Sequence, residues 1–379
     1  MPDAVYITRL SKFLPNEPVS NEQMEKYLGM VDGTPSKAKP LILRNNQIKS
    51  RYYALDKNGN STHTNTELTV EAIKGLFDDN FKASNIDMLA CGTTSPDQLL
   101  PSHTSMVHGA LMNKAVEIIS PAGSCCSGMH AMRYAYLSVL AGERQNAVCA
   151  GSEKLSIWML AKNFKKETDK EARIKKKPIV AFKKDFLRWM LSDGAGAALL
   201  SPEPNKEGLS LKIDWIESAS FAHKLDACMY AGCEKMEDGS IKGWREYPSE
   251  EILEKTLLSL QQDVDLLGDN IVPVGNEFLL DIVKRRGVDI EEIDWFLPHI
   301  SSEFFRKHIE EELTRSDMPI PQEKWFTNLT RFGNVGAASI FFMLEELFYS
   351  DKLKKGDKIL CMVPESARFS YVYVMLTAV

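Results

Sequence analysis

The chain contains the same succession of segments twice, and this duplication limits its possible folds more than any other feature of the sequence. Each half contains, in order, a buried strand, a second strand, a loop of small residues, a helix and a third strand. In the first half we expect these segments at 86–91, 115–119, 121–127, 128–140 and 147–151. In the second half we expect them at 293–298, 324–327, 331–339, 340–349 and 358–363.

The strands of both halves are continuous apolar runs that alternate with helices. This pattern is typical of mainly parallel sheets that are covered by helices on both faces, so we predict a layered α/β fold. Proline, asparagine and glycine gather at 202–208, and we therefore divide the chain into halves at 1–204 and 205–379. Ligands of such folds bind beyond the carboxyl ends of the strands, where functional residues are expected.

Composition and charge exclude several classes of protein. Of the 379 residues, 44% are hydrophobic and 26% are charged, which is typical of globular proteins and not of disordered chains or coiled coils. The formal charge of −6 argues against a protein whose surface as a whole binds nucleic acid or an anionic membrane. No apolar run approaches the roughly 18 residues of a membrane span, and residues 1–10 lack a signal pattern. We expect a cytoplasmic protein that binds no nucleic acid and has no membrane span.

The seven cysteines match no metal or disulfide pattern. They include no C-x-x-C pair, which excludes a zinc ribbon, and their odd number argues against a disulfide framework. No metal is expected. Most of them lie in apolar or small-residue runs, where a buried structural thiol is the simplest interpretation. Only the neighbours Cys125 and Cys126 have a setting that suggests chemistry.

One stretch reverses the sign of the chain's charge. The insertion at about 158–190 contains eleven basic residues against four acidic ones between Lys162 and Arg188, a net charge of +7. Such a stretch is either a solvated surface or a docking site for an acidic partner. The sharp reversal of sign favours the acidic partner.

The loop at 121–127 places Cys125 and Cys126 at the start of a helix, among small residues. Backbone N–H groups and the helix dipole favour a thiolate there, so we expect the cysteine pKa to fall below its usual value of about 8.5. A thiolate that a substrate can reach is able to accept an acyl group. Position alone does not separate the two cysteines, and a buried structural thiol is an equally good interpretation.

Two further polar side chains are expected at the same edge of the fold. His299 ends the strand at 293–298, where it is either hydrogen-bonded into the core or a donor to a thioester oxygen. Asn334 lies in the loop at 333–339, whose glycines permit close approach of a ligand. A glycine-asparagine loop most often forms a simple turn, so neither feature is specific by itself.

The order of four motifs along the chain is more specific. They are C-S-G at 126–128, D-G-A-G-A-A at 193–198, P-H at 298–299 and G-N-V-G-A-A-S at 333–339. This combination resembles the thiolase superfamily and, within it, the ketoacyl-ACP synthase III group. The resemblance also covers 6–21, 93–102 and 151–153, and thus nearly the whole chain. It implies a duplicated αβαβα fold with two mixed, mainly parallel five-stranded sheets and helices between and outside them.

The resemblance implies roles for residues of this sequence. Cys126, directly before Ser-Gly, is then the acyl-accepting nucleophile. His299 and Asn334 bind the carbonyl of a second thioester, so that its α-carbon becomes a carbanion and a Claisen condensation follows. The substrates are acyl-ACP or acyl-CoA thioesters, no cofactor is required, and a homodimer is expected.

Substrate contacts are expected from the same resemblance. In related enzymes, the residue at the position of Leu100 closes the acyl tunnel of the partner subunit, so Leu100 is expected to reach that tunnel. An acidic acyl carrier protein is expected to dock on the basic insertion. Its predicted contacts are Lys175, Lys176 and Lys177, with Arg306 and Lys307 as secondary ones.

Two departures from the group point to a divergent relative. The usual Gln-Ala-Asn after the histidine is Ile-Ser-Ser at 300–302, and the usual glycine-rich turn near the C-terminus is P-E-S-A-R-F-S at 364–370. With the stretch at 45–53 and the basic insertion, these features resemble the dialkylresorcinol-forming condensing enzymes. Those enzymes join an acyl chain to a 3-oxoacyl thioester and close a cyclohexanedione ring. Glu365 is then a candidate base, although a solvated loop carboxylate is the simpler interpretation.

Three alternatives stay open. An ordinary initiation enzyme would decarboxylate malonyl-ACP, and an acyltransferase would use Cys126 without condensation. A silent partner subunit would have lost the cysteine. The presence of Cys126, His299 and Asn334 argues against the last two.

Overall fold

The computed structural model describes residues 2–111, 114–164 and 186–379. Within this part, nine strands form one continuous sheet, because β1 pairs with β8 at Tyr6 and Ile7 as well as with β7. In spatial order the strands are β13 (Trp295–Pro298), β14 (Lys358–Glu365), β15 (Ser370–Ala378), β8 (Leu211–Ser220), β1 (Tyr6–Phe13), β7 (Gly194–Ser201), β6 (Ala147–Glu153), β4 (Met88–Thr93) and β5 (Glu117–Ile119).

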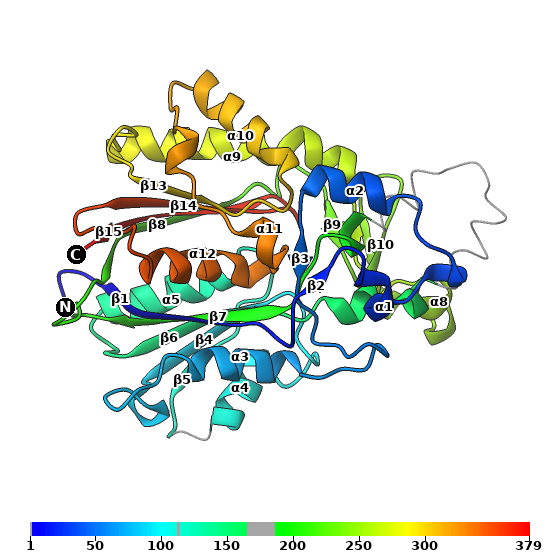
Figure 1. Ribbon diagram of the computed structural model, residues 1–379, viewed down its shortest axis with the longest axis horizontal. Coiled ribbons are helices and arrows are strands. Elements are labelled where there is room, and N and C mark those ends of the chain that lie inside the picture. Colours follow the sequence, from blue (N-terminus) through cyan, green and yellow to red (C-terminus); the bar gives the residue numbers. More distant parts are fainter. Residues whose placement is uncertain (1, 112–113, 165–185) are drawn as a thin grey trace.

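The helices divide the sheet into layers, as Figure 1 shows. They are α1 (Met24–Leu28), α2 (Lys39–Asn46), α3 (Asn65–Lys74), α4 (His103–Leu111), α5 (Ser127–Leu140), α8 (Ser249–Glu254), α9 (Val264–Arg286), α10 (Phe304–Arg315), α11 (Leu329–Phe332) and α12 (Ser339–Phe348). The helices α9 and α10 cover the portion of the sheet that contains β13, β14, β15 and β8, and α3 and α4 cover the other portion (Figure 1). Between the two portions lie α5 and α12. The predicted αβαβα layering is confirmed.

The strand directions differ in detail from the prediction. Parallel pairing joins β13 to β14 and joins β4 to both β5 and β6. The other pairs of the large sheet are antiparallel. Helical crossovers connect only the parallel strands, whereas the short turn at 366–369 makes a hairpin of β14 and β15. The strands are therefore not mainly parallel, and the portion that begins at β13 contains four strands before it joins β1.

One expected strand does not form. The segment at 324–327 begins at the end of a 3-10 helix (Gln322–Lys324) and makes only an isolated bridge between Trp325 and Phe296. The Trp325 ring lies edge-on to Phe296, with 4.9 Å between the ring centres, and its Nε1 donates to the Ile320 carbonyl at 2.9 Å. The apolar character of this segment therefore reflects one buried tryptophan. The other expected strands and helices of both halves are present, with ends shifted by a few residues.

Short strands form small sheets beside the large one. They are β2 (Val19–Ser20) with β3 (Ser50–Arg51), β9 (Met229–Tyr230) with β12 (Gln261–Gln262), and β10 (Cys233–Lys235) with β11 (Ile241–Gly243). With α1, α2 and α8, several of them gather at one end of the molecule (Figure 1). The predicted boundary at residue 204 falls in the loop between β7 and β8.

The central helices approach the sheet through backbone contacts. A Cβ atom on Gly92 would lie 2.2 Å from the Ser127 carbonyl oxygen at the start of α5. Cβ atoms on Gly128 and Gly151 would lie 2.4 and 2.2 Å from the Ala337 carbonyl oxygen. Only glycine permits such distances. The first turn of α5 is thus packed directly against β4 and against the segment around Ala337.

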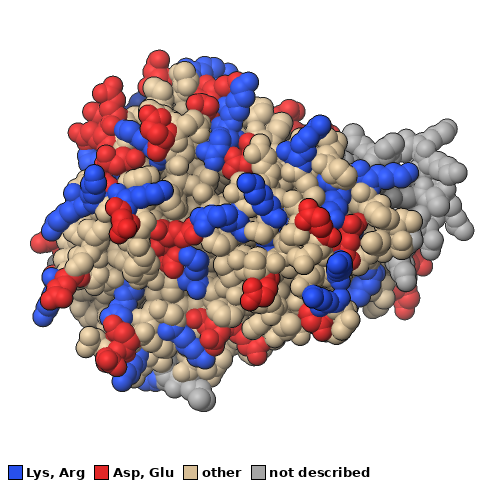
Figure 2. All heavy atoms as spheres, in the orientation of Figure 1, with Lys and Arg blue, Asp and Glu red and all other residues tan. Residues whose placement is uncertain are grey.

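The surface and the cysteines add three observations. Basic and acidic side chains of the described residues alternate over the face in Figure 2, without a large area of one sign. All seven cysteines are buried, and none of them forms a disulfide within the described residues. Among the helices of the described ranges, none is long and apolar enough to cross a membrane.

Candidate active site

Three of the predicted site residues, Cys126, His299 and Asn334, lie in one region around a cavity. The cavity has a volume of about 1000 Å³, which includes the part open to solvent. Its wall contains His299, Asn334 and Cys125, together with Thr94 and Gly336. These residues follow β4 and β13 or lie just before α5 and α12, so loops of both halves of the chain build the site.

Cys126 lies beside the cavity and not in its wall. Its side chain is completely buried, and Sγ donates a hydrogen bond to the Val363 carbonyl at 3.2 Å. Its neighbour Cys125 is 9% exposed and lines the cavity. The resting structure therefore presents Cys125 to the cavity, and the Cys126 thiol has to turn away from Val363 to meet a substrate.

Burial outweighs the expected effect of the helix terminus on the thiols. Removal from water, with the Glu365 carboxylate nearby, raises the pKa of Cys126 well above its ordinary value. Burial and the carboxylates of Glu365 and Glu153 raise the pKa of Cys125 to about 12. The expectation of a lowered pKa is wrong for the resting protein. A thiol in this setting keeps its proton until a substrate arrives.

His299 is held at the end of β13 as a neutral imidazole. Its backbone N–H donates to the Met362 carbonyl at 2.8 Å, which extends the pairing of β13 with β14. Burial lowers the pKa of its ring to about 4, so one ring nitrogen carries a proton that it can donate at neutral pH. Val363 follows Met362 directly and accepts the Cys126 thiol hydrogen bond. The end of β14 therefore contacts both residues.

Hydrogen bonds on both sides fix Asn334. Its backbone N–H donates to the Met190 carbonyl at 3.0 Å, and its carbonyl accepts the Ser192 N–H at 2.9 Å. Its side-chain Oδ1 accepts the Gly336 N–H at 2.9 Å. Because Oδ1 is engaged, Nδ2 is the group that can donate to a substrate oxygen. His299 and Asn334 thus provide two donors to one cavity, as a developing enolate oxygen requires.

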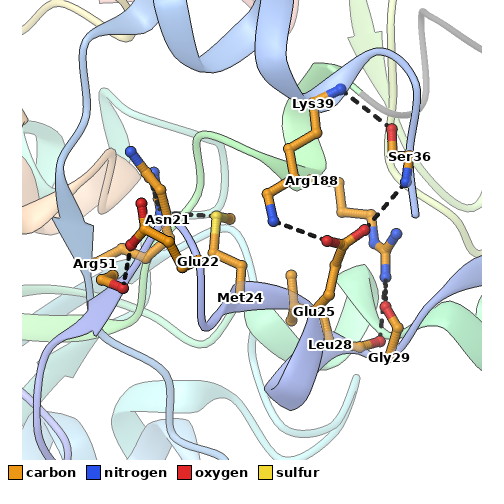
Figure 3. A network of polar contacts seen from close by, with 11 residues as sticks. Asn21, Glu22, Met24, Glu25, Leu28, Gly29, Ser36, Lys39, Arg51 and Arg188 are labelled. Carbon is orange, nitrogen blue, oxygen red and sulfur yellow. Dashed lines mark hydrogen bonds and ion pairs between the residues drawn. The ribbon is translucent and has the colours of Figure 1, made fainter.

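Arg51 belongs to a buried polar network (Figure 3), and its contacts lead to the segment that binds the Asn334 backbone. Arg51 is completely buried, and its guanidinium donates to Asn21 Oδ1 at 2.8 Å and to the Trp189 carbonyl at 3.4 Å. Trp189 directly precedes Met190, whose carbonyl binds the Asn334 backbone. Arg51 therefore connects β3 to the segment whose backbone binds Asn334.

The same network changes the interpretation of the basic insertion. The guanidinium of Arg188, which belongs to the predicted docking segment, is buried and donates to the Leu28 carbonyl at 3.2 Å (Figure 3). Its charge is inside the protein and is not available to a carrier. Lys175, Lys176 and Lys177 lie outside the described residues, and their docking role stays a prediction.

The other predicted substrate contacts lie outside the cavity wall. Arg306 is paired with Glu303 at 2.5 Å and donates to Thr327 Oγ1 at 2.7 Å, so its guanidinium is already engaged. The side chain of Lys307 is 80% exposed. Leu100 is 84% exposed in the loop between β4 and α4. Their roles toward a carrier protein or a partner subunit stay predictions.

Glu365 is not a solvated loop carboxylate. It is buried at the end of β14, and its Oε2 accepts the backbone N–H groups of Ser124 at 2.9 Å and of Cys126 at 3.1 Å. Burial raises its pKa, although these two hydrogen bonds act in the opposite direction. A carboxylate with a raised pKa beside the nucleophile is a candidate for proton transfer.

A second carboxylate at the site was not recognised from the sequence. Glu153, at the end of β6, is completely buried and accepts hydrogen bonds from Thr94 Oγ1 at 2.6 Å, Ser95 Oγ at 2.7 Å and the Ala337 N–H at 3.3 Å. Burial raises its pKa to about 7. It joins the loop after β4 to the loop of Asn334. The available signal was a charged residue at the end of an otherwise apolar strand.

Comparison with known proteins relates this geometry to a family. The family described as 3-Oxoacyl-[acyl-carrier-protein (ACP)] synthase III C terminal matches residues 283–364, which include His299 and Asn334. A beta-ketoacyl-[acyl-carrier-protein] synthase III from Clostridium perfringens is 25% identical over 349 residues, which are 92% of this chain and 91% of the relative. The chain is similar to the ketoacyl synthase III condensing enzymes, at residues 283–364 through the family match and over most of its length through the relative. Like these relatives, it is an enzyme of the acyltransferase type.

Solved structures share the fold of this ketoacyl synthase III-like enzyme over nearly its whole length. The tetronic acid condensing enzyme AbyA1 has a TM-score of 0.76 at 17% identity and covers 98% of this chain and 99% of its own. A variant of Xanthomonas campestris OleA, with bound lauric acid and lauroyl-CoA, has a TM-score of 0.70 at 18% identity and covers 100% of both chains. At these identities the likeness establishes the thiolase-like fold.

The neutral His299 predicts how the stability of this ketoacyl synthase III-like enzyme depends on pH. The ring has a pKa of about 4 in the folded protein, whereas an imidazole in the unfolded chain binds its proton near pH 6.5. Between these values only the unfolded state takes up the proton. The stabilisation is therefore complete above pH 6.5, and the free energy of unfolding falls by about 1.4 kcal/mol per pH unit below it.

Urea unfolding in steps from about pH 7 to pH 5 measures this slope. His299→Gln should reduce the slope of the free energy of unfolding with pH by the contribution of one histidine. Part of the slope should persist, because burial also lowers the pKa of His103 to about 4. An identical slope in the wild type and the variant would contradict the assignment.

Proposed function

We propose that this enzyme joins an acyl chain carried on Cys126 to a 3-oxoacyl thioester and closes a cyclohexanedione ring, as in dialkylresorcinol biosynthesis. The observation that carries the proposal is the buried Glu365 carboxylate, which accepts the backbone N–H groups of Ser124 and Cys126. A base at this position serves a substrate whose α-proton has to be removed. A malonyl substrate loses carbon dioxide instead and has no such need.

In the first step, Cys126 accepts an acyl group. Its sulfur attacks the thioester carbon, the bond from that carbon to the carrier sulfur breaks, and the thiol proton ends on the released carrier thiol. The cavity wall contains the apolar side chains of Leu267, Ile271 and Leu279, and each buried CH₂ group of a chain contributes about 0.8 kcal/mol. The lauric acid and lauroyl-CoA bound to OleA support a medium-chain acyl thioester as substrate here.

In the second step, a 3-oxoacyl thioester loses its α-proton to Glu365. Two carbonyls acidify this proton, and the ring of His299 and Nδ2 of Asn334 donate to the enolate oxygen that forms. The α-carbon then attacks the acyl carbon on Cys126, and the carbon–sulfur bond to Cys126 breaks. Cys126 leaves as a thiolate and regains a proton from Glu365, so the residues return to their first state. In ring closure, a carbon of the joined chains loses a proton and attacks the remaining thioester carbon. The bond from that carbon to the carrier sulfur breaks, and the proton ends on the released carrier thiol.

We infer that the carrier of these thioesters is an acyl carrier protein and that the enzyme is a homodimer. The strand β5 lies at the end of the sheet and has one unpaired edge among the described strands. The side chains of Leu99 and Leu100 are exposed in the loop that precedes α4, the helix next to β5. An exposed apolar pair near a free strand edge supports a second copy of the chain at this place.

The decisive assay supplies acyl-ACP together with either 3-oxoacyl-ACP or malonyl-ACP and identifies the products by mass spectrometry. The proposal predicts a cyclic product that contains both alkyl chains from the first mixture. Isotope-labelled carbons in each substrate identify the atoms that form the two bonds. A 3-oxoacyl product that appears only with malonyl-ACP would assign the enzyme to the ordinary initiation class, in agreement with the names of its relatives.

A further inference from the structure

The acyl cavity follows two outer helices away from the catalytic residues. One wall is formed by Leu267, Ile271, Gly275 and Leu279, which lie four residues apart and therefore on one face of α9. The other wall contains one face of α10. Gln262 precedes α9 and lies at the catalytic end, because its Oε1 accepts a hydrogen bond from Ser366 at 3.4 Å. The cavity thus extends from Ser366 along the length of α9.

The far part of this wall contains polar side chains. Asn276 lies about 18 Å along α9 from its first residue, at roughly 1.5 Å per residue, and Glu312 lies about 12 Å along α10. Both belong to the cavity wall. An otherwise apolar part of the cavity wall therefore has polar groups on two facing helices, several turns along α9 from Gln262.

One atom of this group lacks a partner. Asn276 is 7% exposed, and its Nδ2 donates to Ser316 Oγ at 2.6 Å, with longer contacts to the Glu312 carbonyl at 3.4 Å and to its Oε1 at 3.5 Å. Its Oδ1 has no hydrogen-bond partner among the described residues. A buried carbonyl oxygen without a donor is unfavourable, so a ligand that supplies the donor is stabilised there.

We propose that Asn276 and Glu312 form a polar subsite for a hydroxyl group near the far end of the acyl chain. The proposal rests on the proposed function, because it takes the cavity as the acyl site. A hydroxyl donates to Asn276 Oδ1 and carries no charge into a wall that is otherwise apolar. An anionic chain end is disfavoured by the Glu312 carboxylate, which is ion-paired with Arg315. An ammonium group would lose its hydration without a free carboxylate to replace it.

The unaltered protein provides the first test. Octanoyl, decanoyl and dodecanoyl thioesters are compared with their ω-hydroxy counterparts, and intact-protein mass spectrometry measures the rate at which each pair loads Cys126. In a purely apolar cavity, a terminal hydroxyl lowers the loading rate about tenfold or more. The subsite predicts that, at one chain length, the hydroxylated thioester is loaded at least as fast as its partner. A slower hydroxylated partner at every length would overturn the proposal.

Substitution of Asn276 tests whether this residue causes the effect of the terminal hydroxyl on loading. Asn276→Leu should lower the ratio of hydroxylated to plain loading about fivefold or more at that chain length. Asn270→Leu is the matched control, because Asn270 lies on the same helix, donates to the Leu266 carbonyl at 2.9 Å and is absent from the cavity wall. Its ratio should equal that of the wild type. An unchanged ratio in Asn276→Leu would overturn the proposal, and if that variant does not fold, the wild-type ratio decides.

Failure of the proposed function gives a different result. If neither thioester of any pair loads Cys126, the acyl-enzyme step is contradicted. Equilibrium binding of dodecanoic acid and ω-hydroxydodecanoic acid, measured by calorimetry, then tests the subsite alone. Tighter binding of the hydroxy acid, lost in Asn276→Leu, supports the subsite, and weaker binding of the hydroxy acid overturns it.

Discussion

Replacement of Cys126 by alanine should abolish the covalent acyl adduct completely. The thioester carbon needs a sulfur nucleophile, and an alanine methyl group provides none. The loss should hold for every acyl thioester that the wild type accepts. Intact-protein mass spectrometry after incubation with acyl-ACP or acyl-CoA measures the mass increase, and far-ultraviolet circular dichroism shows that the variant is folded.

The matched control is Cys125→Ser, which should retain the adduct. This comparison is informative because the resting structure places Cys125, and not Cys126, in the cavity wall. Retention of the adduct would show that the Cys126 thiol leaves Val363 when substrate binds. An adduct that peptide mapping locates on Cys125 would reverse the assignment of the nucleophile.

Glu365→Gln should separate the two halves of the reaction. Acylation of Cys126 should persist, whereas condensation with a 3-oxoacyl thioester should fall about 10²-fold or more, because an amide cannot remove the α-proton. The amide oxygen can still accept the Ser124 and Cys126 N–H groups, so the loop geometry is expected to be kept. Single-turnover kinetics of the preloaded acyl-enzyme measure the second half alone.

The reactivity of Cys126 in the Glu365→Gln variant tests the contact between these two residues. The Glu365 carboxylate raises the pKa of Cys126, so removal of its charge should lower the pH at which iodoacetamide alkylates this thiol. Glu292→Gln is a suitable control, because Glu292 is exposed and paired with Lys358 on the surface. Equal condensation rates and equal alkylation profiles in wild type and Glu365→Gln would remove Glu365 from the mechanism.

The order of elements could be predicted from the sequence because apolar runs and small-residue loops are local signals. His299 was found in the same way because it ends an apolar strand, and Asn334 because it lies in one of the small-residue loops. Strand direction was harder to predict. It depends on whether a helix or a tight turn follows the strand, and the turn after β14 contains Arg368 and Phe369 in place of the usual glycines.

The roles of the buried carboxylates could not be predicted with the same certainty. Glu365 contacts Ser124, from which it is separated by 241 positions in the sequence, and no local pattern encodes such a contact. The pKa of Cys126 was mispredicted for a related reason. The position at a helix start is visible in the sequence, but the loss of hydration that dominates the pKa arises from packing of distant segments.

The glycines that bring α5 against β4 and against Ala337 tolerate fewer substitutions than the cavity-wall residues of α9 and α10. Where main chain touches main chain, at Gly92, Gly128 and Gly151, any side chain would displace the nucleophile from the loop of Asn334. Evolution is therefore expected to leave these positions unchanged while the walls of α9 and α10 vary. New substrates can arise in such an enzyme by replacement of one or two helix side chains, without renewed selection of the catalytic geometry.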